Sequence, residues 1–294
     1  MFEEFKNAFS RPNNGHIQLI LLNVILFIAL AVVYVVSTVS GFGYVFKLVH
    51  DQFSLSPLPS EFLTHPWTLI TYAFAHSLSD IWHILFNMIS LYWFGKLFLE
   101  YMGNDRLIAL YVLGAIAGGL LYLLLSNTVP FFQAHAASGM VGASAAIYAI
   151  MVGCATLLPD YTFFLLFFGP VRIKYIAFFF ILLSFLGTVS ANAGGNIAHL
   201  GGAMVGWVYV RQLQQGRNLG GWITSVMNAV ARLFRRKPRI RVEYRRQGPS
   251  VSRTEPNASV SQQEIDAILD KISERGYESL SREEKEKLFR AGKK

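Results

Sequence analysis

The chain alternates long apolar segments with short polar ones as far as about residue 213. A helix needs roughly 20 apolar residues to cross about 30 Å of hydrocarbon, and six segments approach that length. They cover residues 17–39, 80–99, 105–126, 142–158, 171–190 and 194–213. The pattern predicts an all-α integral membrane protein built as a bundle of six transmembrane helices.

Two connections within this region are rich in apolar residues but are not expected to span. Residues 41–77 are mixed in polarity, rich in aromatic side chains and interrupted by prolines. They predict a long interfacial first loop that contains short amphipathic helices. The stretch FFLLFFGP at 163–170 is too short to cross and belongs to the connection before the fifth segment.

Beyond residue 216 the chain becomes soluble in character. The stretch GGWITSVMNAVARLFRRKPRIRVEYRR is basic and amphipathic, which is typical of a segment that binds anionic lipid or of a basic flank that only fixes topology. Two capping boxes, Ser261 with Glu264 and Ser281 with Glu284, then predict a helical hairpin. The expected division is an N-terminus (1–16), a membrane domain (17–213), a basic segment and linker (214–260) and a C-terminal hairpin (261–294).

Composition agrees with this picture. Hydrophobic residues make up 53% of the chain, including 24 Phe, which points to lipid rather than to one soluble core. The net charge of +8 is concentrated after the last apolar segment, which favours a membrane-facing tail over nucleic acid as partner. A single cysteine, Cys154, excludes a disulfide framework.

Lys and Arg separate the loops into two sides. They occur before the first segment, in alternate short loops and after the sixth segment, at Lys6, Arg11, Lys96, Arg106, Arg172, Lys174, Arg211 and Arg217. Because such residues are retained on the cytoplasmic side, both termini are expected there. We therefore expect a multi-pass protein of the bacterial cytoplasmic membrane.

Four polar side chains lie in spans where burial in lipid is costly, and such residues are functional candidates. His83 and Asn87 begin the second segment, Ser144 begins the fourth and His199 begins the sixth. These three segments enter from the same, non-cytoplasmic face, and each residue falls in the first two turns. At ~1.5 Å per residue, all four lie within roughly 10 Å of that face.

This set suits acyl transfer, which needs a hydroxyl nucleophile, a base and donors for the developing oxyanion. Ser144 and His199 supply the nucleophile and the base. His83, the Asn87 amide and the backbone N–H of Ser144 supply donors. The second, fourth and sixth segments hold no carboxylate at this depth, so the sequence predicts a dyad rather than a triad.

Small residues explain how the fourth and sixth segments could approach. They recur every four positions in both segments, at Ala145, Ala149 and Gly153 and at Ala198, Gly202 and Gly206. Such series let helix backbones pack closely in a membrane. Such series also occur where packing is their only role. The functional interpretation therefore depends on the polar residues that lie at the same depth in these segments.

The motifs GASAA followed by Tyr148, HILFN and AHLGGAMVG resemble the serine, HxxxN and histidine motifs of rhomboid intramembrane proteases. The resemblance covers about residues 17–213. It implies that Ser144 is the nucleophile and His199 the base, with His83, Asn87 and the Ser144 amide as the oxyanion hole. It further implies that Tyr148 stacks on the histidine and that Gly142 is the first glycine of the serine motif.

By the same resemblance, the substrates are transmembrane proteins with helix-destabilising residues near the cut, and the fifth helix with its loop gates entry from lipid. The sequence departs from the family twice. Ala145 replaces the second glycine of the serine motif, and Trp67-Thr68 stands where many members have Trp-Arg. A methyl at 145 is expected to loosen the contact between the fourth and sixth helices.

Three other interpretations agree less well with the sequence. A rhomboid-like pseudoprotease would bind transmembrane helices without cutting them, but it would have lost the serine or histidine. A transporter should show broken inverted repeats, and a metal site at His76, His83, His135 and His199 would lack both HExxH and accompanying carboxylates. We expect no metal or cofactor; the physiological substrate and the oligomeric state are not encoded in any recognisable motif.

Overall fold

The computed structural model describes residues 13–134, 139–234 and 262–291, and the chain divides into two units, 1–236 and 237–294. The first unit contains most of the helices: α2 (Gly15–Val39), α3 (Gly43–His50), α4 (Pro59–Thr64), α5 (Thr68–Thr71), η1 (Tyr72–Phe74), α6 (Ile81–Met102), α7 (Asn104–Thr128), α8 (Pro130–Ala134), α9 (Ser144–Leu157), α10 (Ile173–Gly187), α11 (Ala193–Gln214) and α12 (Gly221–Phe234). Strands β1 (Thr162–Leu165) and β2 (Gly169–Arg172) join α9 to α10.

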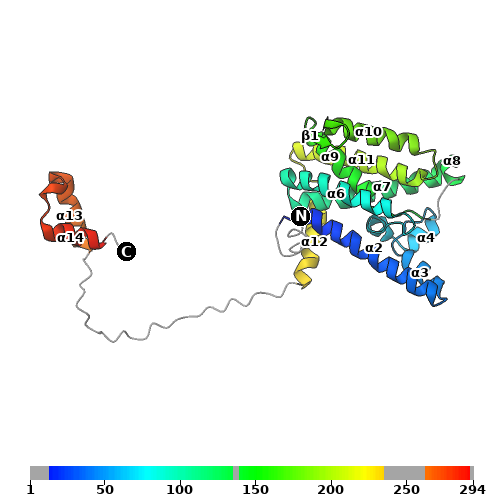
Figure 1. Cartoon of the computed structure of the whole chain (residues 1–294), viewed down its shortest axis with the longest axis horizontal. Helices are drawn as coiled ribbons and strands as arrows, with labels where there is room; N and C mark the ends of the chain where they lie inside the picture. The colour runs from blue at the N-terminus through cyan, green and yellow to red at the C-terminus, as the bar shows by residue number, and fades with distance from the viewer. Residues whose placement is uncertain (1–12, 135–138, 235–261, 292–294) are drawn as a thin grey trace. The chain divides into compact units, whose positions relative to one another are not determined.

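Helices occupy all six segments that the apolar pattern marked, and Figure 1 shows α6, α7, α9, α10 and α11 running alongside one another. Within the described residues, two helices, α2 and α7, are long and apolar enough to cross a membrane by length and composition. The helices α9 and α10 are apolar but have 14 and 15 residues. At 1.5 Å per residue, 14 residues reach only ~21 Å. The helices α6 and α11 have 22 residues each but carry several polar side chains.

The first loop folds into the short helices α3, α4, α5 and η1, as its mixed polarity predicted. It is hydrogen-bonded to the segment that precedes α9. Leu55 and Met140 exchange two backbone hydrogen bonds of 2.9 Å, and the Gly142 N–H donates to the Tyr72 carbonyl at 2.9 Å. The loop therefore fixes the backbone from which α9 starts.

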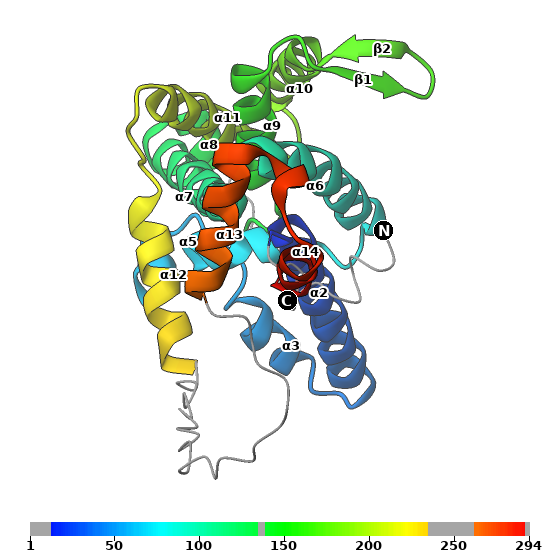
Figure 2. The ribbon, with the colours of Figure 1, turned by 90° about the vertical axis from the view of Figure 1, so that its left-hand side faces the viewer.

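The all-α expectation needs one correction, because residues 162–172 form a small antiparallel hairpin. Phe163 pairs with Val171 and Leu165 with Gly169. Gly169 adopts φ +68° after a three-residue turn, a backbone conformation that favours glycine. The short apolar stretch was correctly excluded as a span, but it forms two short strands that pair across a turn ending at Gly169. Figure 2 shows β1 and β2 extending beyond α10.

The interior of the first unit is packed backbone to backbone around α9. A Cβ added to Gly202 of α11 would overlap the Ala145 carbonyl, and one added to Gly206 would overlap the Ala149 carbonyl. The Ala145 methyl instead faces α7, where a Cβ at Gly118 would come within 2.6 Å of it. The methyl therefore does not separate α9 from α11, contrary to our expectation, because Gly118 leaves room for it.

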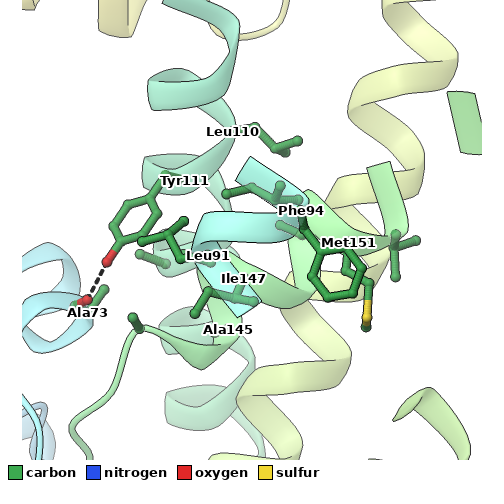
Figure 3. Close-up of a cluster of buried hydrophobic side chains, with 14 of the residues drawn as sticks. Ala73, Leu91, Phe94, Leu110, Tyr111, Ala145, Ile147 and Met151 are labelled. Atoms are coloured by element: carbon green, nitrogen blue, oxygen red, sulfur yellow. Dashed lines mark hydrogen bonds between the residues drawn. The ribbon is translucent and has the colours of Figure 1, made fainter. Parts of the chain in front are cut away.

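Larger apolar side chains from α6, α7 and α9 fill the space around these contacts (Figure 3). Tyr111 of α7 lies fully buried among them. Its hydroxyl donates to the Ala73 carbonyl at 2.6 Å, drawn as a dashed line in Figure 3, and accepts from the Asn23 amide at 3.1 Å. This tyrosine ties α2, η1 and α7 together.

The second unit contains α13 (Gln262–Arg275), η2 (Tyr277–Ser279) and α14 (Arg282–Ala291). The capping box of α14 forms, since Ser281 and Glu284 exchange hydrogen bonds of 2.7 and 3.2 Å. Lys271 of α13 bonds Glu284 at 2.9 Å. Ser261 of the other capping box, residues 1–12 of the predicted N-terminus and residues 235–261 of the basic segment and linker lie outside the described residues.

Candidate active site

Ser144 is the first residue of α9, and its position depends on an unusual backbone before it. Gly142 has φ +136°, which an L side chain rarely adopts. A Cβ there would also lie 2.9 Å from the His83 Nε2. Because the first N–H groups of a helix have no partner within the helix, the Ser144 N–H is free to act on a ligand beside its hydroxyl.

His199 lies in the second turn of α11 and faces Ser144. Its Nε2 is 2.7 Å from the Ser144 Oγ, within hydrogen-bond distance. The close approach of α9 and α11 at Gly202, one turn after His199, makes this distance attainable. The two residues that the sequence placed at one depth are therefore in contact.

Tyr148, one turn after Ser144, stacks on the histidine. The two rings are nearly parallel, with an interplanar angle of 10° and centroids 4.3 Å apart. The other histidine nitrogen, Nδ1, has a partner that the sequence analysis missed: the Ser184 hydroxyl of α10, at 3.1 Å. Ser184 is the single polar side chain among residues 176–186, so the rule that drew attention to Ser144 would also have found it.

His83 and Asn87 lie on one face of α6, where the sequence spacing places them. The Asp80 carboxylate caps this helix by accepting from the backbone N–H of Trp82 at 3.0 Å and of His83 at 3.3 Å. The Asn87 amide donates one hydrogen to the His83 carbonyl at 2.8 Å. An amide has two hydrogens, so the second can serve a ligand.

His76 supports His83 from the first loop. Their rings meet edge to face with centroids 5.2 Å apart, and the His76 side chain is buried. Burial, with a smaller contribution from His83, lowers the pKa of His76 to about 3. His76 is therefore neutral at physiological pH and adds no charge beside His83.

A cavity of about 750 Å³ contains Ser144, His83, Asn87 and Tyr148. Its walls come from α6, α9 and α10, from residues 139–141 and from the start of α11. A smaller hollow of about 130 Å³ adjoins it and is lined by His83, Ser144 and His199 together. The selected residues are thus divided between two cavities that share Ser144 and His83, whereas His135 lies outside the described residues.

The comparisons with known proteins agree with the motifs. Residues 63–215, more than half of the chain, match the Rhomboid domain family. The chain belongs to the rhomboid family. In this rhomboid, residues 257–294 also match a family of unknown function named DUF6576. The matched residues include α13 and α14.

Two curated relatives align with the rhomboid segment. One is "RHOMBOID-like protein 12, mitochondrial" of Arabidopsis thaliana, 36% identical over 51% of this chain and 47% of the relative. The other is "Rhomboid protein 1, mitochondrial" of Saccharomyces cerevisiae, 32% identical over 52% of this chain and 43% of the relative. The alignments span less than half of each relative. Because both relatives are named as mitochondrial, our prediction of a bacterial cytoplasmic membrane was wrong.

Proposed function

We propose that this rhomboid is an intramembrane serine endopeptidase that hydrolyses peptide bonds of transmembrane proteins. The observation that carries the proposal is the 2.7 Å contact between the Ser144 Oγ and the His199 Nε2. It joins a proposed nucleophile and base from helices that are far apart in sequence, and Ser144 also lines the cavity that contains the candidate oxyanion donors His83 and Asn87. This is the arrangement that acyl transfer requires.

The same proposal includes a bundle of six membrane-spanning helices: α2, α6, α7, α9, α10 and α11. Its support is the distribution of apolar surface. The helix α2 leaves Ile25, Ile28 and Val32 more than half exposed, and α10 does the same with Phe178 and Phe185. Exposed apolar belts of this kind around a core of small residues suit lipid as the surrounding solvent. The names of the two relatives favour a mitochondrial membrane.

In the proposed reaction, the Ser144 Oγ attacks the scissile carbonyl carbon while the His199 Nε2 takes the hydroxyl proton. The carbonyl oxygen becomes an oxyanion that accepts hydrogen bonds from the Ser144 N–H, His83 and Asn87. His199 then returns the proton to the leaving amine as the C–N bond breaks, which leaves an ester on Ser144. Water, activated by the same base, hydrolyses the ester and releases the carboxylate.

Substrate would reach Ser144 through the cavity of about 750 Å³, whose walls include Phe86 of α6 and Phe180 of α10. A cavity with both apolar and polar walls suits a transmembrane segment that is partly unwound, since its exposed backbone would find hydrogen-bond partners among the polar residues of the lining.

The alternative is a rhomboid that binds transmembrane helices without cutting them. We expect a fluorophosphonate probe to label the purified wild-type protein, because the probe traps an activated serine, and we expect Ser144→Ala and His199→Ala to prevent labelling. Cleavage of a transmembrane substrate in detergent should be lost in parallel. Labelling that survives Ser144→Ala would assign the reactive group elsewhere, and an unlabelled wild type with intact fold would favour the non-catalytic alternative.

A further inference from the structure

Ser184 occupies a position that packing alone does not explain. It lies in α10 within a run of apolar residues, and it is 1% exposed. Burying a hydroxyl is costly unless it is hydrogen-bonded. Ser184 meets this requirement with two side chains of the candidate active site, Tyr148 and His199.

These contacts form a directed chain of hydrogen bonds. The Tyr148 hydroxyl donates to the Phe180 carbonyl at 3.3 Å, and the Ser184 hydroxyl donates to the Tyr148 oxygen at 2.8 Å. Each hydroxyl has a single hydrogen. The Ser184 oxygen can therefore only accept in its 3.1 Å contact with the His199 Nδ1.

The direction of these hydrogen bonds determines the tautomer of His199. If Ser184 accepts, the proton of the neutral imidazole resides on Nδ1, and Nε2 keeps its lone pair. Nε2 is the atom 2.7 Å from the Ser144 Oγ. This is the tautomer that a general base for Ser144 must have, since the partner of one ring nitrogen decides what the other can do.

We propose that Ser184 is a positioning residue that holds His199 in the Nδ1–H tautomer and aims its Nε2 at Ser144. In this role it takes the place of the carboxylate of a triad. The proposal rests on the proposed protease function for its effect on catalysis, whereas its effect on the imidazole exists whether or not the protein cleaves substrate.

This series of hydrogen bonds also links His199 to α10, because both Ser184 and the Phe180 carbonyl belong to that helix. The Phe180 side chain lines the cavity of about 750 Å³. Other apolar side chains of α10 are exposed. A displacement of α10 would stretch the hydrogen bonds to Tyr148 and His199 together. Under this proposal, the orientation of His199 therefore depends on the position of α10.

The kinetic test compares three variants of the full chain in detergent. Ser184→Ala should lower kcat and the fluorophosphonate labelling rate by about 10- to 100-fold with KM nearly unchanged, because orientation is lost and substrate contacts are kept. Ser184→Thr keeps a hydroxyl and should restore most of the rate. Ser37→Ala is the matched control, because Ser37 is also buried and, among the residues that the structure describes, its hydroxyl bonds only a carbonyl of its own helix at 3.1 Å.

A spectroscopic test does not depend on activity. In protein labelled with ¹⁵N-histidine, the His199 resonances, assigned by their absence in His199→Gln, should show one Nδ1–H tautomer in wild type and Ser184→Thr. Ser184→Ala should give a mixture of tautomers. If Ser184→Ala does not fold, Ser184→Cys replaces it, since the thiol has a similar shape but makes a much weaker hydrogen bond.

The outcomes separate the two proposals. Unlabelled wild type would contradict the protease function, while the tautomer measurement would still decide the role of Ser184. If Ser144→Ala abolishes activity but Ser184→Ala matches Ser37→Ala in kcat and keeps the wild-type tautomer, Ser184 has no positioning role. A fall in activity that Ser184→Thr does not reverse, with an unchanged tautomer, would likewise overturn it.

Discussion

Substituting Gly202 tests whether close packing of α9 and α11 sets the geometry of the dyad. A Cβ at this position would lie 2.8 Å from the carbonyl carbon of Ala145 and would overlap its oxygen. Carbon atoms in contact prefer about 3.5–4.0 Å, so Gly202→Ala should force the two helices apart by roughly 1 Å. Overpacking of this kind costs about 1–3 kcal/mol of folding stability.

The catalytic effect should be larger than the loss of stability suggests. Gly202 lies one turn after His199, on the face that contacts α9, so the displacement acts directly on the 2.7 Å contact with Ser144. A misplacement of about 1 Å can reduce rates by about 10²-fold. We therefore expect Gly202→Ala to lower kcat about 100-fold in a protein that still folds, measured by substrate cleavage alongside thermal unfolding.

Gly206→Ala is the matched control for this prediction. Its Cβ would lie 2.9 Å from the carbonyl carbon of Ala149, which is nearly the same clash one turn further from the dyad. The loss of stability should be similar and the loss of kcat smaller. Equal losses of kcat in two variants of equal stability would refute the idea that the contact at Gly202 acts locally on the base.

Two further predictions concern stability. Tyr111→Phe should destabilise the protein by about 1–3 kcal/mol, because the Ala73 carbonyl loses its side-chain donor and the Asn23 amide keeps only its bond to the Leu19 carbonyl. Tyr122→Phe should change the stability little, since the buried Tyr122 hydroxyl has no hydrogen-bond partner among the described residues. Thermal unfolding compares the two variants, and equal effects would contradict this account. In the second unit, the Lys271 hydrogen bond and the Ser281 N–H lower the pKa of Glu284 to about 2, so its stabilising effect is present above pH 4.5 and is lost as pH falls towards 2. Amide hydrogen exchange of α14 in the whole protein, corrected for intrinsic rates, should accelerate in wild type as the pH falls through this range and should change less in Glu284→Gln. Identical profiles for the two proteins would contradict a stabilising role of the Glu284 carboxylate.

Much of the fold follows from features that are local in sequence. The apolar runs locate all six main helices, and the spacing of His83 from Asn87 and of Ser144 from Tyr148 places each pair on one helix face. The side chains around the dyad were identifiable because polar residues are costly in apolar helices. Ser184 obeys the same rule, and it was overlooked because it matches no motif and lies in a helix without other candidates.

Features that depend on distant contacts could not be predicted in this way. The Ala145 methyl seemed a weakness in the serine motif, yet its neighbour is Gly118 of α7, which no spacing within α9 reveals. The β1–β2 hairpin is a different case, because its strands pair across a three-residue turn. Its strands were not predicted because the stretch is almost uniformly apolar and shows no alternation of polar and apolar residues.

The backbone pairing of Leu55 with Met140 and of Tyr72 with Gly142 has a consequence for how the site forms. The nucleophile stands on a segment whose shape is set by a loop made much earlier in the chain, so α9 can be complete before Ser144 is correctly placed. Contacts between distant segments carry the cost of closing a long loop and form late in folding. The proposed reactivity at Ser144 is therefore expected to arise only after the first loop has docked against the segment that precedes α9.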